Sequence, residues 1–167
     1  KIINHEKRKG YDKFDTFLEF SNNVQNAKND LMDLLNKLKL DGKNIVGYGA
    51  SGRANTMIQY CGISLEHLDY MIDDAPAKHG FYTPGSHFPI YPRTILSSDK
   101  APDYVLVFAW SFFKEILIRN EIYVKKGGRL LNNSGMKLNQ KPFQPTTEDL
   151  HKNGKNFPPN FLHESWM

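Results

Sequence analysis

A glycine-rich turn is the feature of this 167-residue chain with the clearest chemistry. The segment Gly47-Tyr48-Gly49-Ala50-Ser51-Gly52 matches the pattern G-x-G-x-x-G, and it lies between a predicted strand and a predicted helix. Glycines let a backbone turn tightly and approach a ligand, and the N–H groups that open a helix favour a phosphate. Ser51 and Arg53 add a hydroxyl donor and a cation for the same anion. The turn therefore predicts a phosphate site; the alternative is a tight connection that binds nothing.

Two acids follow the next predicted strand. Asp73 and Asp74 come about 20 residues after the turn, where a dinucleotide fold places the carboxylate that accepts bonds from ribose hydroxyls. This spacing favours NAD as a ligand. The alternative is that both acids are exposed strand ends.

A long loop, residues 75–92, supplies further candidate side chains. It contains four of the nine prolines and is predicted to be ordered without regular secondary structure. Such a loop can line a polar site beside the carboxyl ends of parallel strands. Trp110 follows the third predicted strand and is expected to border the same crevice. The alternatives are a purely structural loop and a tryptophan that only fills the core. The loop combines hydroxyl groups, aromatic residues, the lysine Lys78 and two histidines, His79 and His87.

Catalytic chemistry is much less evident. We find no Ser-His-Asp order, no G-x-S-x-G elbow and no set of residues with metal-ligand spacing, so no catalytic or metal residue is assigned. The sequence predicts binding rather than catalysis.

The elements that position these residues alternate along the chain. Apolar residues at helical spacing predict a long helix over residues 14–40 with one buried stripe, capped by Asp12 or Asp15. Strands are predicted at residues 44–48, 68–72, 103–109 and 129–131, and helices at 53–60 and 112–124. This order predicts a Rossmann-like α/β fold, an open and mainly parallel sheet flanked by helices. The domain is expected to cover residues 1–138, with an extended tail at 139–167.

Composition narrows the class of protein. The chain has 22 basic and 18 acidic side chains, a net charge of +4, and its basic excess lies in residues 1–13 rather than on the predicted body. A nucleic-acid partner is therefore not expected. A single cysteine, Cys61, cannot form an internal disulfide, and no apolar run has the ~20 residues that a membrane span needs. We expect a cytoplasmic protein with no membrane partner.

Three stretches together resemble a known family. They are the turn with its continuation Arg53-Ala54-Asn55-Thr56, residues 73–90 with Tyr82-Thr83-Pro84-Gly85, and residues 102–110 with Pro102-Asp103-Tyr104-Val105-Leu106. In this order they resemble the C-terminal domain of the S-adenosylmethionine-dependent sugar C-methyltransferases. The resemblance covers about residues 11–131.

The resemblance implies a role for the chain and for individual residues. In that family the Rossmann-like C-terminal domain helps to hold a nucleotide-sugar substrate, while S-adenosylmethionine, the catalytic residues and a zinc-binding segment belong to upstream domains. No cofactor is then expected in this chain, which would be inactive alone and would have the upstream methyltransferase domain as its partner. Residues implied at the substrate are Gly47, Gly49, Ala50, Ser51, Gly52, Arg53, Asn55, Thr56, Asp73, Lys78, Tyr82, Thr83, His87 and Trp110.

Two other functions stay open at this point. An independent NAD(P)-binding module would need an acid after the turn that is free to accept both ribose hydroxyls. A non-enzymatic interaction domain would bind neither ligand.

Overall fold

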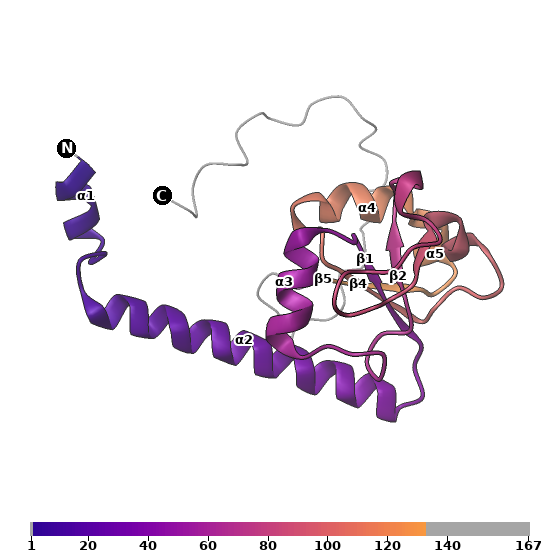
Figure 1. The fold of residues 1–167 in the computed structure, drawn as a ribbon, viewed down its shortest axis with the longest axis horizontal. Helices are drawn as coiled ribbons and strands as arrows, with labels where there is room; N and C mark the ends of the chain where they lie inside the picture. Colours follow the sequence, from indigo (N-terminus) through magenta and orange to yellow (C-terminus); the bar gives the residue numbers. More distant parts are fainter. Residues whose placement is uncertain (1, 133–167) are drawn as a thin grey trace.

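The computed structural model describes residues 2–132, and the predicted tail lies outside the described residues. Its centre is a sheet of five parallel strands in the order β3-β2-β1-β4-β5 (Figure 1). The strands are β1 (Ile45–Tyr48), β2 (Met71–Asp73), β3 (Ile90–Pro92), β4 (Tyr104–Val107) and β5 (Arg129–Asn132). The prediction of an open parallel sheet is confirmed. Because the chain leaves β1 in one direction and returns to β4 on its other side, a ligand crevice is expected where these two strands end.

Helices cover both faces of the sheet. The helices α2 (Phe14–Leu40) and α3 (Gly52–Cys61) pack against Ile45, Met71 and Leu106 on one face. On the other face, α4 (Phe113–Arg119) and α5 (Glu121–Lys125) pack against strand residues of opposite parity, among them Val105. The central strands are therefore apolar on both sides, as parallel strands between two helical layers are.

The sequence around α3 explains both of its ends. Ser51 has an extended backbone and its Oγ accepts a hydrogen bond of 3.3 Å from the N–H of Ala54, which caps the first turn. Gly62 ends the helix in the left-handed region at φ 75°, and its N–H bonds to the carbonyl of Ile58. The helix thus begins immediately after the glycine turn, as predicted.

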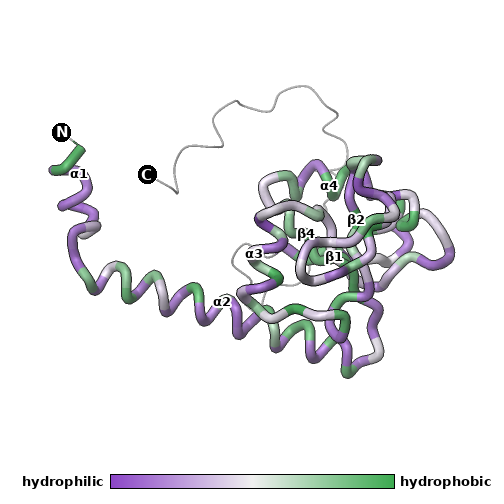
Figure 2. Tube along the Cα trace, in the orientation of Figure 1, coloured by the Kyte–Doolittle hydropathy of each residue, from purple (hydrophilic) through white to green (hydrophobic). Residues whose placement is uncertain are grey.

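The structure differs from the sequence prediction along α2. Lys13 occupies the N-cap position without a side-chain hydrogen bond, so the prediction of a cap by Asp12 or Asp15 is wrong. A short helix, α1 (Ile2–Arg8), precedes α2 instead. The stripe is buried only near the end of the helix, because the first half extends beyond the sheet and its covering layers (Figure 2).

Three further predictions of element boundaries are wrong. The strand expected at 68–72 begins only at Met71 and ends at Asp73. Residues 75–92 include a 3₁₀ helix, Pro76–Lys78, and end in β3. This strand pairs with β2 at the edge of the sheet. An edge strand tolerates proline, because its outer side needs no N–H donor for a neighbouring strand. The helix expected at 112–124 is divided at Asn120. The side chain of this buried residue donates to the carbonyl of Ile116 at 2.7 Å, which provides a local alternative to helix continuation.

No helix within residues 2–132 is both long and apolar enough to cross a membrane.

Candidate functional site

The glycines of the turn serve different purposes. Gly47 lies within β1, where a Cβ atom would overlap the side chain of Met71. Gly49 has φ +97°, and a Cβ there would be 3.0 Å from the Cβ of Ala109. Ala109 lies two residues after the end of β4. Nothing lies within 4 Å of a Cβ built on Gly52. The first two glycines are therefore needed by the fold, and the third leaves open space at the start of α3.

Asp73 ties the turn to the strand beside it. Its Oδ2 accepts a bond of 2.8 Å from the N–H of Ala50, and its Oδ1 accepts one of 2.9 Å from the N–H of Ala75. The ammonium of Lys78 completes this arrangement, 2.9 Å from Asp73 Oδ2 and 2.8 Å from the carbonyl oxygen of Ala50. Since Asp73 is only 7% exposed, its carboxylate stabilises the turn from inside the fold and does not face a ligand.

Asp74 points to the opposite face of the sheet. It accepts a bond of 2.9 Å from the hydroxyl of Tyr48 and lies 3.3 Å from both Arg93 Nε and Arg119 Nη1. Burial, together with the bond to Asp74, raises the pKa of Tyr48 well above its ordinary value, so the phenol remains a donor. Both acids at the end of β2 are thus engaged within the chain, and neither is left free for a ribose.

Free backbone donors lie at the start of α3. The N–H groups of Gly52 and Arg53 bond to no acceptor among residues 2–132, whereas that of Ala54 is capped by Ser51. The guanidinium of Arg53 extends towards β4, where Nη1 is 3.3 Å from Ser111 Oγ and the ring centre of Trp110 is 5.8 Å away. Arg53 forms no ion pair within the described part of the chain. This helix end therefore presents donors and an uncompensated cation.

A cavity of about 490 Å³ opens beside these donors, between α3 and the loop after β2. It brings together half of the residues expected at the site: Ala50, Ser51, Gly52, Asn55, Lys78, Tyr82 and Thr83. The structure does not place the others in its lining: Gly47, Gly49, Arg53, Thr56, Asp73, His87 and Trp110. Thr56 instead bonds to the carbonyl of Gly52 at 3.1 Å, one turn back in the helix.

The apolar part of the lining was missed from the sequence. It consists of Ala54, Ile58, Ala77, Phe81, Pro84 and Ile90. The adjacent aromatics Phe81 and Tyr82 are 66% and 64% exposed, in a loop that the sequence had already singled out. An exposed aromatic pair beside polar loop residues was the available signal.

Thr83 and His87 shape the loop. Thr83 is buried, and its N–H and Oγ1 both bond to the backbone of Phe88 at 2.9 Å. His87 is exposed and sits in the left-handed region at φ 54°, with its N–H bonded to the carbonyl of Thr83. Their hydrogen bonds close a tight turn that holds Tyr82 at the cavity.

A known protein family matches most of this chain. The profile of the C-methyltransferase C-terminal domain matches residues 1–133. The chain belongs to this family. The resemblance read from the three stretches of sequence is therefore confirmed.

One curated relative of this C-methyltransferase C-terminal domain is C-methyltransferase NovU from Streptomyces niveus. It is 26% identical over 130 residues, which are 78% of this chain and 31% of the relative. The chain thus spans less than a third of the length of that relative.

Proposed function

We propose that this C-methyltransferase C-terminal domain binds the substrate of the methyl transfer, a nucleotide diphosphate sugar or a molecule of similar chemistry. The observation that supports the proposal is the pair of free N–H groups of Gly52 and Arg53, which open next to the cavity. A diphosphate at this helix end would accept both bonds and would lie at the positive end of the helix dipole.

The cations around this helix end are unequal. Lys78 is neutralised by Asp73 and is held by the carbonyl of Ala50, so it shapes the wall more than it attracts an anion. Arg53 has no acidic partner among the described residues and stands over Trp110. We therefore assign to Arg53 the charge-assisted bond to the diphosphate.

The remainder of the cavity suits the less charged part of the ligand. Phe81 and Tyr82 provide aromatic surface at the opening, and Ile58 and Ile90 provide apolar surface further in. A ligand with an anionic group and a ring system would meet both kinds of surface.

The methyl donor and the base for the methyl transfer would lie outside residues 2–132. The transfer needs a sulfonium donor held in line with a deprotonated carbon, and therefore both a donor site and a base. Residues 2–132 contain no group of His, Cys, Asp and Glu that could hold a metal, and both acids near the turn are engaged in the fold. We propose that S-adenosylmethionine and the base belong to the rest of a longer C-methyltransferase, acting in the cytoplasm.

Calorimetric titration of the purified chain tests the ligand. We expect binding of UDP-glucose and weaker binding of inorganic pyrophosphate, but no binding of NADH, because Asp73 and Asp74 are engaged. We also expect no binding of S-adenosylmethionine and no methyl transfer by the chain alone. A stoichiometric micromolar site for S-adenosylmethionine would mean that the glycine turn holds the methyl donor.

The variant Arg53→Ala tests the phosphate assignment. Loss of one charge-assisted bond costs about 1.5–3 kcal/mol, roughly a 10- to 150-fold weaker affinity for UDP-glucose. The matched control is Arg129→Ala. Arg129 also stands over an aromatic ring, that of Tyr104 at 5.7 Å, but it begins β5 and so lies at the amino ends of the strands, away from the turn at the carboxyl end of β1. Equal affinities for Arg53→Ala and the wild-type chain, with equal melting temperatures, would contradict the assignment.

A further inference from the structure

The first half of α2 carries large aromatic side chains that are mostly exposed within residues 2–132. Phe14 is 77% exposed, and Phe17 and Phe20 are each 57% exposed. This segment, residues 14–28, is called the bare half of α2 below. It extends away from the sheet and its covering helices (Figure 1). A cluster of exposed phenylalanines on one helix is typical of an interaction surface.

The bare half continues the same apolar face that enters the core. Phe17, Val24, Leu31 and Leu38 follow one another at intervals of seven residues, which is close to two helical turns, so they share a face of α2. Leu31 and Leu38 on that face are buried against the sheet layer. Whatever covers Phe17 must therefore approach from the side on which the body of the domain lies, next to α3.

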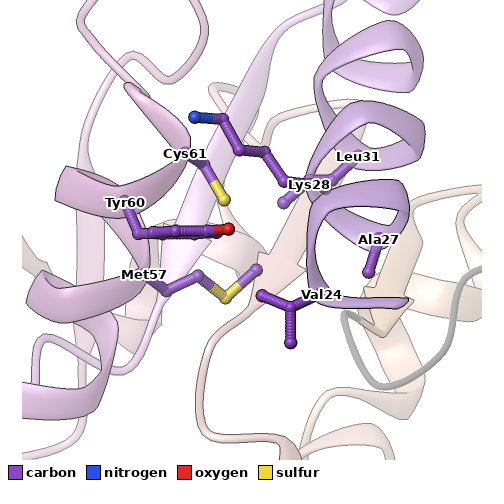
Figure 3. A pocket seen from close by; sticks show the side chains of 7 residues that line it. All are labelled: Val24, Ala27, Lys28, Leu31, Met57, Tyr60 and Cys61. Atoms are coloured by element: carbon purple, nitrogen blue, oxygen red, sulfur yellow. The ribbon is translucent and has the colours of Figure 1, made fainter. Parts of the chain in front are cut away.

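A cavity of about 180 Å³ lies where the covered part of α2 meets the bare half. From α2 it is lined by Val24, Ala27, Lys28 and Leu31, and from α3 by Met57, Tyr60 and Cys61 (Figure 3). Lys28 Nζ stands 5.0 Å from the centre of the Tyr60 ring. Burial raises the pKa of the Cys61 thiol, which therefore contributes apolar lining rather than a nucleophile.

We propose that the bare half of α2 and this cavity are the docking surface for the remainder of a C-methyltransferase chain, the part that holds the methyl donor. The inference rests on the proposed function. More than two thirds of the Streptomyces niveus relative lies outside the matched stretch, which corresponds to a C-terminal domain. Because the matched family is a C-terminal domain, we infer that this part of the relative precedes the elements equivalent to α1 and α2. A covalent link at this end raises the effective concentration of the linked domain to about the millimolar range, which favours this occupant over a second copy.

The helix α3 lies between the docking surface and the candidate ligand site. One flank of α3, with Ala54, Asn55 and Ile58, lines the candidate ligand site. The neighbouring flank, with Met57 and Tyr60, lines the cavity beside the bare half. An α-helix with its side chains is about 10–12 Å across, so a domain docked on the bare half would lie one helix width from the bound substrate. Docking there brings the methyl donor next to the ligand site.

Association of two separate polypeptides tests the proposal. The first is this chain, and the second is the part of the Streptomyces niveus relative that precedes its C-terminal domain. Sedimentation of the mixture without ligand is expected to show a complex with the wild-type chain. The double variant Phe17→Ser/Phe20→Ser is expected to bind at least about tenfold more weakly, because two apolar contacts are lost.

The control is the double variant Ile118→Ser/Ile122→Ser. It also removes two exposed apolar side chains, but from α4 and α5 on the other face of the sheet. It is expected to associate like the wild-type chain. Because Phe17 and Phe20 are exposed, their variant is expected to keep the wild-type melting temperature, so weaker association would not reflect unfolding.

Three results would overturn the docking proposal. They are no complex with the wild-type chain, a complex that Phe17→Ser/Phe20→Ser does not weaken, and a homodimer of the wild-type chain that this variant dissociates. The last result would assign the bare half to a second copy. Since no ligand is present, the outcome is independent of nucleotide-sugar binding, which fails or succeeds in its own titration.

Discussion

The two halves of α2 share one helix and one apolar pattern, but all of its buried residues lie in the second half. Leu35, in the second half, is 0% exposed and packs against the core, whereas Phe17, in the first half, is more than half exposed. The apolar spacing that predicts a buried face is present in both halves. The comparison shows that periodicity predicts that a face will be covered, but not which part of the protein covers it.

Substitutions in the two halves of α2 are expected to differ strongly in their effect on the free energy of unfolding. Leu35→Ala is expected to lower the free energy of unfolding by about 2–5 kcal/mol, because it leaves a cavity in the core. Phe17→Ala is expected to change it by less than about 0.5 kcal/mol, because the side chain is exposed in both states. Urea unfolding of the two variants measures both values. A cost of several kcal/mol for Phe17→Ala would mean that the chain alone covers its bare half.

A buried and a more exposed carboxylate are expected to show the same contrast, with a smaller difference in the free energy of unfolding. Asp73→Asn is expected to lower the free energy of unfolding by about 1.5–3 kcal/mol, since the amide cannot accept every bond from Ala50, Ala75 and Lys78. The control is Asp69→Asn, which breaks an ion pair to Lys39 of 2.8 Å at the surface and is expected to cost less than about 1 kcal/mol. If both variants had the same midpoint in urea, Asp73 would not stabilise the turn.

A third test uses pH on the covered side chain Tyr70. Burial, with smaller contributions from the charges of Asp69 and Tyr91, raises the pKa of Tyr70 to about 12 from its ordinary value of 10.0. Because the folded pKa lies above the unfolded one, the stabilisation is complete below pH 10 and is lost as the pH rises towards 12. At pH 11 the loss amounts to about 1 kcal/mol.

Tyr70→Phe isolates this contribution, because the other groups that titrate in alkali are common to both proteins. Urea unfolding at pH 8 and pH 11 is expected to show a smaller alkaline loss for the variant than for the wild-type chain. Equal losses would indicate that Tyr70 is open to water in the folded state.

The sequence predicted those parts of the fold that depend on local pattern. The alternation of elements gave a parallel sheet, and the spacing from Gly47 to Gly52 located the turn at the end of β1. It did not give the partners of Asp73, because Ala50 and Ala75 donate through backbone atoms that every residue except proline has. The edge strand β3 was missed because Pro89 and Pro92 read as loop residues, although only Ile90 has to be buried there.

The candidate site was predictable in outline only. Seven expected residues line the cavity, since they lie in two stretches that the parallel topology places side by side. Arg53 and Trp110 meet each other next to the cavity rather than within its lining, and His87, in the left-handed region at φ 54°, also lies outside the lining. Such differences depend on side-chain directions, which spacing along the chain does not determine.

The contact between Asp73 and the glycine turn should determine which of these positions vary among related sequences. Asp73 binds backbone N–H groups at positions 50 and 75, and these donors remain whatever side chains stand there, provided that neither becomes proline. Lys78 bonds through its side chain and is partly exposed, so water can replace it on Asp73. Across homologues we expect the acid at position 73 to be nearly invariant and position 78 to drift. An alignment in which position 78 is fixed while position 73 varies would instead show that selection acts on the lysine through the ligand.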